Sequence, residues 1–211
     1  MVQVAVTDLA AYFDDEITAM PNLVTVGAAN TLTTVAGIPF YTGDSGSIYT
    51  HDVSGTDSTA TANTAFGIEA MDAITTGDSN SAFGHYALGA NTTGANNTAV
   101  GKSAMLLNTT GAENVALGFA ALDANTTGNQ NVALGRSALT ANTTASDNIA
   151  VGYGAMDSNT TGTRNIAIGS AAYDHSDTEN DNMAIGYNAM TENTAGGTQN
   201  LAVGNYALDA L

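Results

Sequence analysis

The chain repeats one pattern of apolar and polar positions every seventeen residues over residues 63–211. With φ for an apolar residue, the unit is N-φ-A-φ-G-x-x-A-[LM]-x-x-N-T-T-G-x-x, and nine copies follow one another. Its first glycine returns every seventeen residues from Gly67 to Gly186 and then, eighteen residues later, at Gly204, which predicts a one-residue insertion near Gly196. Helical repeats need ~33 residues or more, so the short period predicts an all-β parallel β-solenoid of nine coils.

The strand of each coil is predicted at N-φ-A-φ-G. Side chains alternate along a strand, so the two φ residues, such as Val115 and Leu117, share one face and the alanine between them occupies the other. We expect the bulky face to fill the coil interior. The alanine face would then let an identical chain approach closely, and nine alanines form a candidate trimer interface: Ala65, Ala82, Ala99, Ala116, Ala133, Ala150, Ala167, Ala184 and Ala202.

Two other assignments of these faces remain open. The bulky residues could meet at the subunit interface with the alanines inside the coil. Alternatively, alanine could be present merely because it fits a thin coil interior.

The rest of the unit supplies a second core strip, a turn and a ladder. The A-[LM] pair, as in Ala121-Leu122, adds apolar side chains to the core. The N-T-T-G tetrapeptide predicts the recurrent turn, because Asn and Gly tolerate positive φ and Asn and Thr bond their own backbone. The first asparagine of the unit, from Asn63 to Asn200, is expected to stack on its equivalents and form a hydrogen-bonded ladder.

Residues 1–62 do not follow the repeat, and we expect them to form a small mixed N-terminal module. The pattern predicts a short helix over residues 7–20 and strands over residues 23–26, 31–35 and 38–42. A solenoid needs a cap where it would otherwise expose strand edges and core. The N-terminal module is therefore the expected cap, and the expected attachment point to a larger body.

The composition disfavours several classes of partner and site. Twenty acidic against three basic residues give a net charge of -17, which disfavours nucleic acid and anionic membranes as partners. The chain has no cysteine, so neither disulfides nor thiolate metal sites are available. Residues 1–20 contain no Lys or Arg and no sustained apolar run, so neither an export signal nor membrane insertion is expected.

The sequence contains no group of residues with the identity and spacing of a catalytic or metal-binding site. His51, His85 and His175 fall at unrelated places without metal-ligand spacing, and no hydrolase, metalloprotease or phosphate-loop motif occurs. The acidic stretch 174–181 could hold calcium in principle, but it lacks the glycine-rich pattern of calcium-binding β-rolls, which favours a solvated loop. We therefore expect no enzyme activity, cofactor or metal.

The strand motif, as in residues 114–118 and 165–169, resembles the head repeats of trimeric autotransporter adhesins, which implies a left-handed β-roll in a trimer. The longer unit, with A-[LM]-x-x-N-T-T-G, is similar to arrays in tail fibres and other surface proteins of bacteriophages. The resemblance covers residues 63–211 and concerns structural positions only. It implies a fold and an oligomeric state, and it transfers no active site.

Three functions compete on this basis. The first is a phage virion structural protein: a trimeric fibre, spike or capsid decoration, made in the host cytoplasm and displayed on the virion surface. The second is a bacterial adhesin head. The third is an ice-binding solenoid, suggested by a threonine ladder that includes Thr92, Thr109, Thr126 and Thr160 but disfavoured because the threonines lie on a turn.

The first function predicts three partners: further copies of the chain, other virion proteins reached through residues 1–62, and a host surface receptor. Positions just after the strand glycine vary between units and are expected to form an exposed stripe of aromatic and basic residues. This candidate host-contact stripe comprises Lys102, Phe119, Arg136 and Tyr153.

Overall fold

The structure of the chain is a computed structural model. It describes residues 59–175, 177–191 and 197–209, and before residue 50 it gives only the backbone of four short strands. The chain divides into two units, residues 1–41 and 42–211, each taken here by itself.

The first unit contains a three-stranded antiparallel sheet in the order β1-β2-β3. Its strands are β1 (Thr25–Val26), β2 (Leu32–Val35) and β3 (Ile38–Pro39). Each of these strands falls within a segment predicted to be a strand, and the remaining residues of those segments lie outside the described residues. The helix predicted over residues 7–20 lies outside the described residues.

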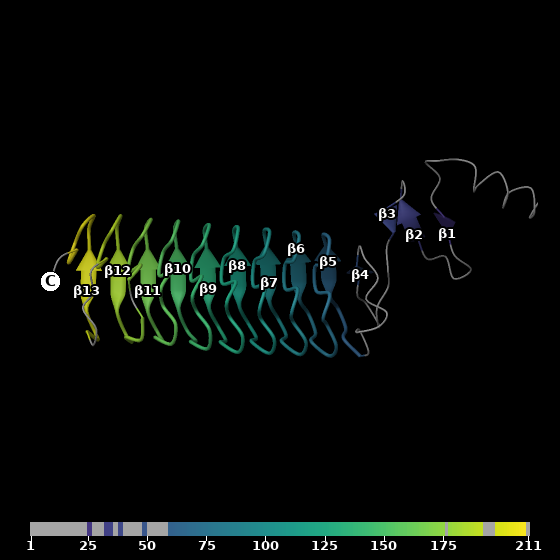
Figure 1. Cartoon of the computed structure of the whole chain (residues 1–211), viewed down its shortest axis with the longest axis horizontal. Helices are drawn as coiled ribbons and strands as arrows, with labels where there is room; N and C mark the ends of the chain where they lie inside the picture. Colours follow the sequence, from purple (N-terminus) through teal and green to yellow (C-terminus); the bar gives the residue numbers. More distant parts are fainter. Residues whose placement is uncertain are drawn as a thin grey trace, which may run out of the picture. The chain divides into compact units, whose positions relative to one another are not determined.

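The second unit is a β-solenoid whose strands form one ten-stranded sheet in the order β13 to β4 (Figure 1). Neighbouring strands are parallel and equivalent residues pair, for example Ala116 with Ala133 and Ala150 with Ala167. The strands are β4 (Ile48–Tyr49), β5 (Thr64–Phe66), β6 (Ser81–Phe83), β7 (Thr98–Val100), β8 (Val115–Leu117), β9 (Val132–Leu134), β10 (Ile149–Val151), β11 (Ile166–Ile168), β12 (Met183–Ile185) and β13 (Leu201–Val203).

Two details of this sheet go beyond the repeat pattern. Strand β4 pairs with β5, so the sheet begins one strand before residue 63. The last interval is eighteen residues, with Met183 opposite Leu201, as the inserted residue requires. Part of the segment that absorbs the insertion, residues 192–196, lies outside the described residues.

The coil interior reverses the expected assignment of the strand faces. All nine strand alanines, from Ala65 to Ala202, are 0–2% exposed and lie in the core of a single chain, so they are not available as a trimer interface. The A-[LM] pairs also lie in the core, and their large side chains are fully buried from Met71 to Met156, including Leu122. A seventeen-residue coil is thin, and a leucine or methionine from one wall leaves room only for a methyl group on the other.

The predicted asparagine ladder is confirmed. Asn131 donates from its side-chain amide to Oδ1 of Asn114 at 3.1 Å and to the carbonyl of Ala145 at 2.8 Å. Its own Oδ1 accepts the backbone N–H of Asn148 at 3.1 Å. The asparagines of this ladder in the interior coils are fully buried, so each makes hydrogen bonds that water cannot replace.

A second ladder runs through the asparagines of N-T-T-G, which the sequence identified only as turn residues. Asn125 donates to Oδ1 of Asn108 at 2.7 Å and to the carbonyl of Gly128 at 3.0 Å, so one amide closes the turn and links two coils. Asn159 ends this ladder, and its Oδ1 has no hydrogen-bond partner among the described residues. Two buried polar columns therefore fix the coil-to-coil register.

Candidate self-association surface

The residues on either side of each strand alanine point outward and form two rows along the solenoid, whose members are half-buried or exposed. Leu117 is 53% exposed and Ile168 is 39% exposed, although both lie in the middle of a parallel sheet. The row at the start of the strands is Thr64, Ser81, Thr98, Val115, Val132, Ile149, Ile166, Met183 and Leu201. The row at their end is Phe66, Phe83, Val100, Leu117, Leu134, Val151, Ile168, Ile185 and Val203. We call these two rows the strand face.

From β8 to β13 both residues of the strand face are apolar in each strand, whereas β5, β6 and β7 begin with Thr or Ser. The coil interior is already complete without these side chains, so they contribute little to the core of their own chain. Large contiguous apolar patches on soluble proteins mark interaction sites. The inward alanines agree with an alternative left open by the sequence, and its other part, that the bulky residues meet at a subunit interface, stays a prediction.

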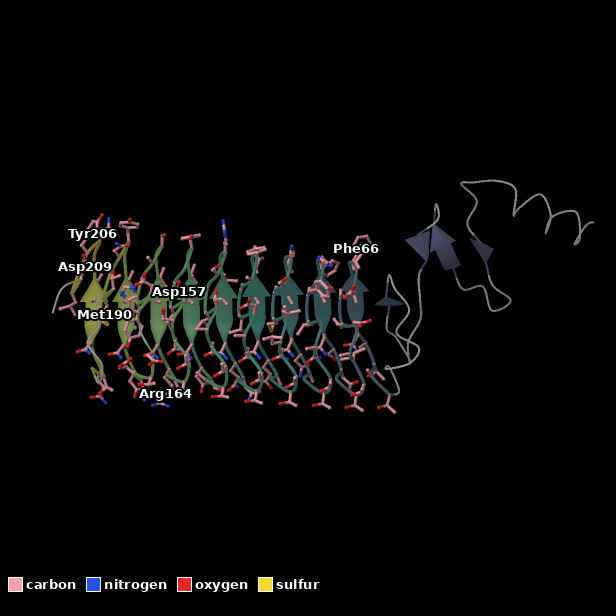
Figure 2. All side chains as sticks on the ribbon, viewed as in Figure 1. Phe66, Asp157, Arg164, Met190, Tyr206 and Asp209 are labelled. Atoms are coloured by element: carbon pink, nitrogen blue, oxygen red, sulfur yellow. The ribbon has the colours of Figure 1, made fainter. Side chains whose placement is uncertain are left out.

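Two rows of exposed residues border the strand face. The leading edge consists of the residues two positions before each strand, including Asn96, Glu113, Gln130, Asp147, Arg164 and Asp181. The trailing edge consists of the residues just after the strand glycine, including the predicted stripe of Lys102, Phe119, Arg136 and Tyr153. Figure 2 shows Arg164 at the opposite end of the coils from Phe66 and Tyr206, which lie near the trailing edge.

The four stripe residues occupy consecutive coils and are exposed, as predicted. The guanidinium carbon of Arg136 lies 5.5 Å from the ring centroid of Phe119 and 5.8 Å from that of Tyr153. Stacking between two rings at such distances is a favourable cation–π arrangement. The two rings flank the guanidinium group of Arg136, which makes no hydrogen bond to the described residues.

The threonine ladder, which suggested the ice-binding alternative, lies on the turns of the solenoid. The first threonine of each turn uses its hydroxyl within the solenoid, as Thr109 does in donating to the carbonyl of Thr126 at 3.0 Å. Thr92 and Thr126 make the equivalent bonds to the next coil. Only the second threonine of each turn, such as Thr110 or Thr127, is exposed, so one row of hydroxyls faces outward.

The acidic stretch after residue 174 is stabilised within the chain. The carboxylate of Glu179 is buried and accepts the backbone N–H groups of Asp177 and Thr178, both at 3.1 Å, so it caps its own turn. Asp181 pairs with Arg164 through two bonds of 2.6 and 2.9 Å. Within the described residues no group of three His, Asp or Glu side chains could hold a metal ion, and no helix could span a bilayer. His51 lies outside these residues.

One carboxylate in this region, that of Asp174, has a pKa above its ordinary value. Burial raises the pKa of Asp174, the neighbouring His175 opposes this increase, and the Asp157 carboxylate on the adjacent coil adds to it. Oδ1 of Asp174 is inaccessible to solvent and has no hydrogen-bond partner among the described residues. The ionised form of Asp174 is therefore poorly solvated in the folded chain.

The raised pKa sets the sign of a pH effect. A carboxyl with a raised pKa binds its proton more tightly when folded, so its stabilising contribution is present in acid and is lost as the pH rises through the folded pKa. Asp174→Asn should therefore raise the Tm at pH 7 by ~1–3 °C, a small effect because Asp174 is partly exposed. This gain should disappear below the pKa of a free aspartate, in a thermal-melt series from pH 3 to pH 7.

Asp181→Asn provides the comparison of opposite sign, because the hydrogen bond to Arg164 lowers the pKa of Asp181. Its removal should not raise the Tm at pH 7. Equal effects of the two substitutions at every pH would contradict this assignment.

No protein-family model, no curated protein and no solved structure matches the chain.

Proposed function

We propose that the chain is a structural protein that associates into a homotrimer through its strand face and forms a rigid, rod-like part of a phage virion surface, as a fibre, spike or capsid decoration. The observation that carries the proposal is the exposed strand face on a solenoid whose core is already complete. Burying such side chains yields roughly 25 cal/mol per Å² of apolar surface removed from water, and an identical chain offers a surface of the same length and period.

The size of the face sets how much surface a trimer could bury. Nine strands spaced ~4.8 Å apart span ~40 Å, and three extended residues are ~10 Å wide, which gives a footprint of about 400 Å². Adding the leading and trailing edges about doubles the width, to roughly 800 Å² per subunit. A trimer divides this area between two neighbours, so each pairwise contact is smaller than the ~800 Å² per partner of a standard interface, and the charged edges are needed to complete it.

The rest of the solenoid favours a structural role, in which it displays a surface, over a catalytic role. The described side chains repeat the same few environments in every coil, namely core, ladder, turn or exposed row, whereas catalysis requires dissimilar groups that converge at one place. In this proposal residues 1–62 attach the solenoid to other virion proteins. The array projects from the particle toward a host surface.

The experiment that tests the biological setting is detection of the chain in purified particles. We expect the protein to co-purify with virions at fixed stoichiometry, and a chain lacking residues 1–62 to be absent from particles although its array remains folded. A bacterial adhesin head is the second candidate, favoured by the resemblance of the strand motif. Presence on cells that carry no phage, with absence from particles, would replace the first proposal by the second.

A further inference from the structure

The two edges of the strand face differ in charge. Two of the chain's three basic residues, Lys102 and Arg136, lie on the trailing edge. That row contains no acidic residue in any of the nine coils, although the chain carries twenty. The leading edge instead contains Glu113, Asp147 and Asp181 on alternating coils.

The described contacts leave the trailing-edge cations available to a partner. Arg164, the other arginine, donates to both carboxylate oxygens of Asp181 and to the hydroxyl of Thr163. In contrast, the guanidinium group of Arg136 lies beside the rings of Phe119 and Tyr153, and within the described part of the chain neither Arg136 nor Lys102 has an acidic partner.

Two acidic residues of the leading edge, Glu113 and Asp147, are also available to bind a basic residue of a partner. Glu113 accepts one bond, from the side-chain amide of Gln130 at 3.0 Å, which leaves its other carboxylate oxygen for a further donor. The carboxylate of Asp147 accepts no hydrogen bond from the described residues. Its electrostatic neighbour Arg164 is already paired with Asp181.

We propose that the trailing edge of one subunit binds the leading edge of the next, with Arg136 paired to Asp147 of the partner subunit and Lys102 paired to Glu113 of the partner subunit. The occupant of this surface is a second copy of the chain. The inference rests on the self-association proposed above and adds the contacts that set its orientation.

Symmetry explains why unlike edges meet. When copies are related by rotation about an axis parallel to the solenoid, the strands of all copies run in the same sense around that axis, so the end of one strand faces the start of the next. The cationic trailing edge then lies against the acidic leading edge. An antiparallel pair related by an axis along the strands would instead place two acidic leading edges together, and like charges at close range repel.

The positions of the charged residues along the rotation axis determine which side chains of neighbouring subunits can pair. Rotation keeps equivalent residues at equal height, and Arg136 follows Gln130 by six residues of a seventeen-residue coil. If the chain climbs evenly by ~4.8 Å per coil, Arg136 lies between the partner's Gln130 and the partner's Asp147, ~3 Å along the axis from the latter. The same offset places Lys102 between the partner's Asn96 and the partner's Glu113. Long side chains span this separation readily.

A charge swap in the full chain tests the pairing. Arg136→Glu faces Asp147 of the partner subunit with a like charge and should raise the concentration at which half the chain assembles by roughly tenfold or more, measured by sedimentation equilibrium. Adding Asp147→Arg to the same chain should restore assembly to near the original concentration. Both effects should diminish at high salt, since exposed charges are screened.

A matched control separates the contact from net charge. Thr110→Glu combined with Thr127→Glu changes the net charge by the same two units at exposed positions outside the strand face, and should leave assembly unchanged. Assembly of Arg136→Glu at the original concentration would overturn the edge contact while leaving self-association intact. Loss of assembly that Asp147→Arg does not restore would overturn the pairing. A monomeric unaltered chain would remove the proposed function itself.

Discussion

Gly118→Ala should lower the free energy of unfolding by roughly 3–5 kcal/mol, combining a strained backbone with an overpacked core. Gly118 has φ of +141°, a conformation that residues with a Cβ rarely adopt. A Cβ at this position would meet the carbonyl oxygen of Gly135 on the next coil. Because that carbonyl belongs to the backbone and accepts the N–H of Ala138 at 3.3 Å, the neighbouring backbone would have to move, and a urea titration followed by circular dichroism should show the loss.

Gly154→Ala is the matched control for this substitution. Gly154 has φ of +60°, and the nearest atom to its added Cβ is 3.9 Å away. Ala120 and Ala171 occupy the same position of other coils with φ of +53° and +51°, so the fold already accepts alanine there. The control should change stability by no more than ~1 kcal/mol. Equal losses for the two variants would contradict the close stacking of the glycine column.

Replacing Leu117 and Ile168 together by serine should prevent assembly without unfolding the chain. Each side chain is partly exposed in the single subunit, so its burial belongs to the proposed interface. At about 1 kcal/mol for each half-buried side chain, two positions in three subunits amount to ~6 kcal/mol, or roughly 10⁴ in the association constant of the trimer. The concentration for half assembly should then rise about a hundredfold, measured by sedimentation equilibrium.

Leu107→Ser provides the matched control, because Leu107 is 50% exposed but lies outside the strand face. It should leave both assembly and folding unchanged. Assembly of the double serine variant at the concentration of the unaltered chain would show that the strand face is not the interface.

The period alone was sufficient for most of the fold. Each coil must place one strand beside its equivalent, so the strands, their parallel register and the ladder at Asn131 follow from seventeen-residue spacing. The second ladder through Asn125 was missed because N-T-T-G is a sufficient turn signal by itself. Only the three-dimensional path shows that the same amide also reaches Asn108 on the neighbouring coil.

The alternation of side chains along the strand could not show which face of the strand points into the coil. Alternation shows that Val115 and Leu117 share a face and that Ala116 takes the other, but not which face is inside. The deciding quantity is the coil thickness, which depends on how Leu122 packs across the interior. Large residues were expected inside because burial usually favours them, yet here the volume available is that of a methyl group.

The exposed stripe was predicted correctly as a set of positions, because the residue after the glycine varies between units. Its relation to the acidic leading edge was not visible in the sequence, since Arg136 and Asp147 are too far apart across the coil to suggest a contact within one chain. The connection appears only when two copies are placed around an axis. The host-contact role of the stripe remains a prediction, in competition with the subunit contact proposed here.

The central claim, that the chain associates through its strand face, is tested most directly by sedimentation equilibrium of the unaltered full chain at micromolar concentration. The account predicts a mass of three times 21.2 kDa. A stable, monodisperse species of 21.2 kDa at that concentration would contradict it.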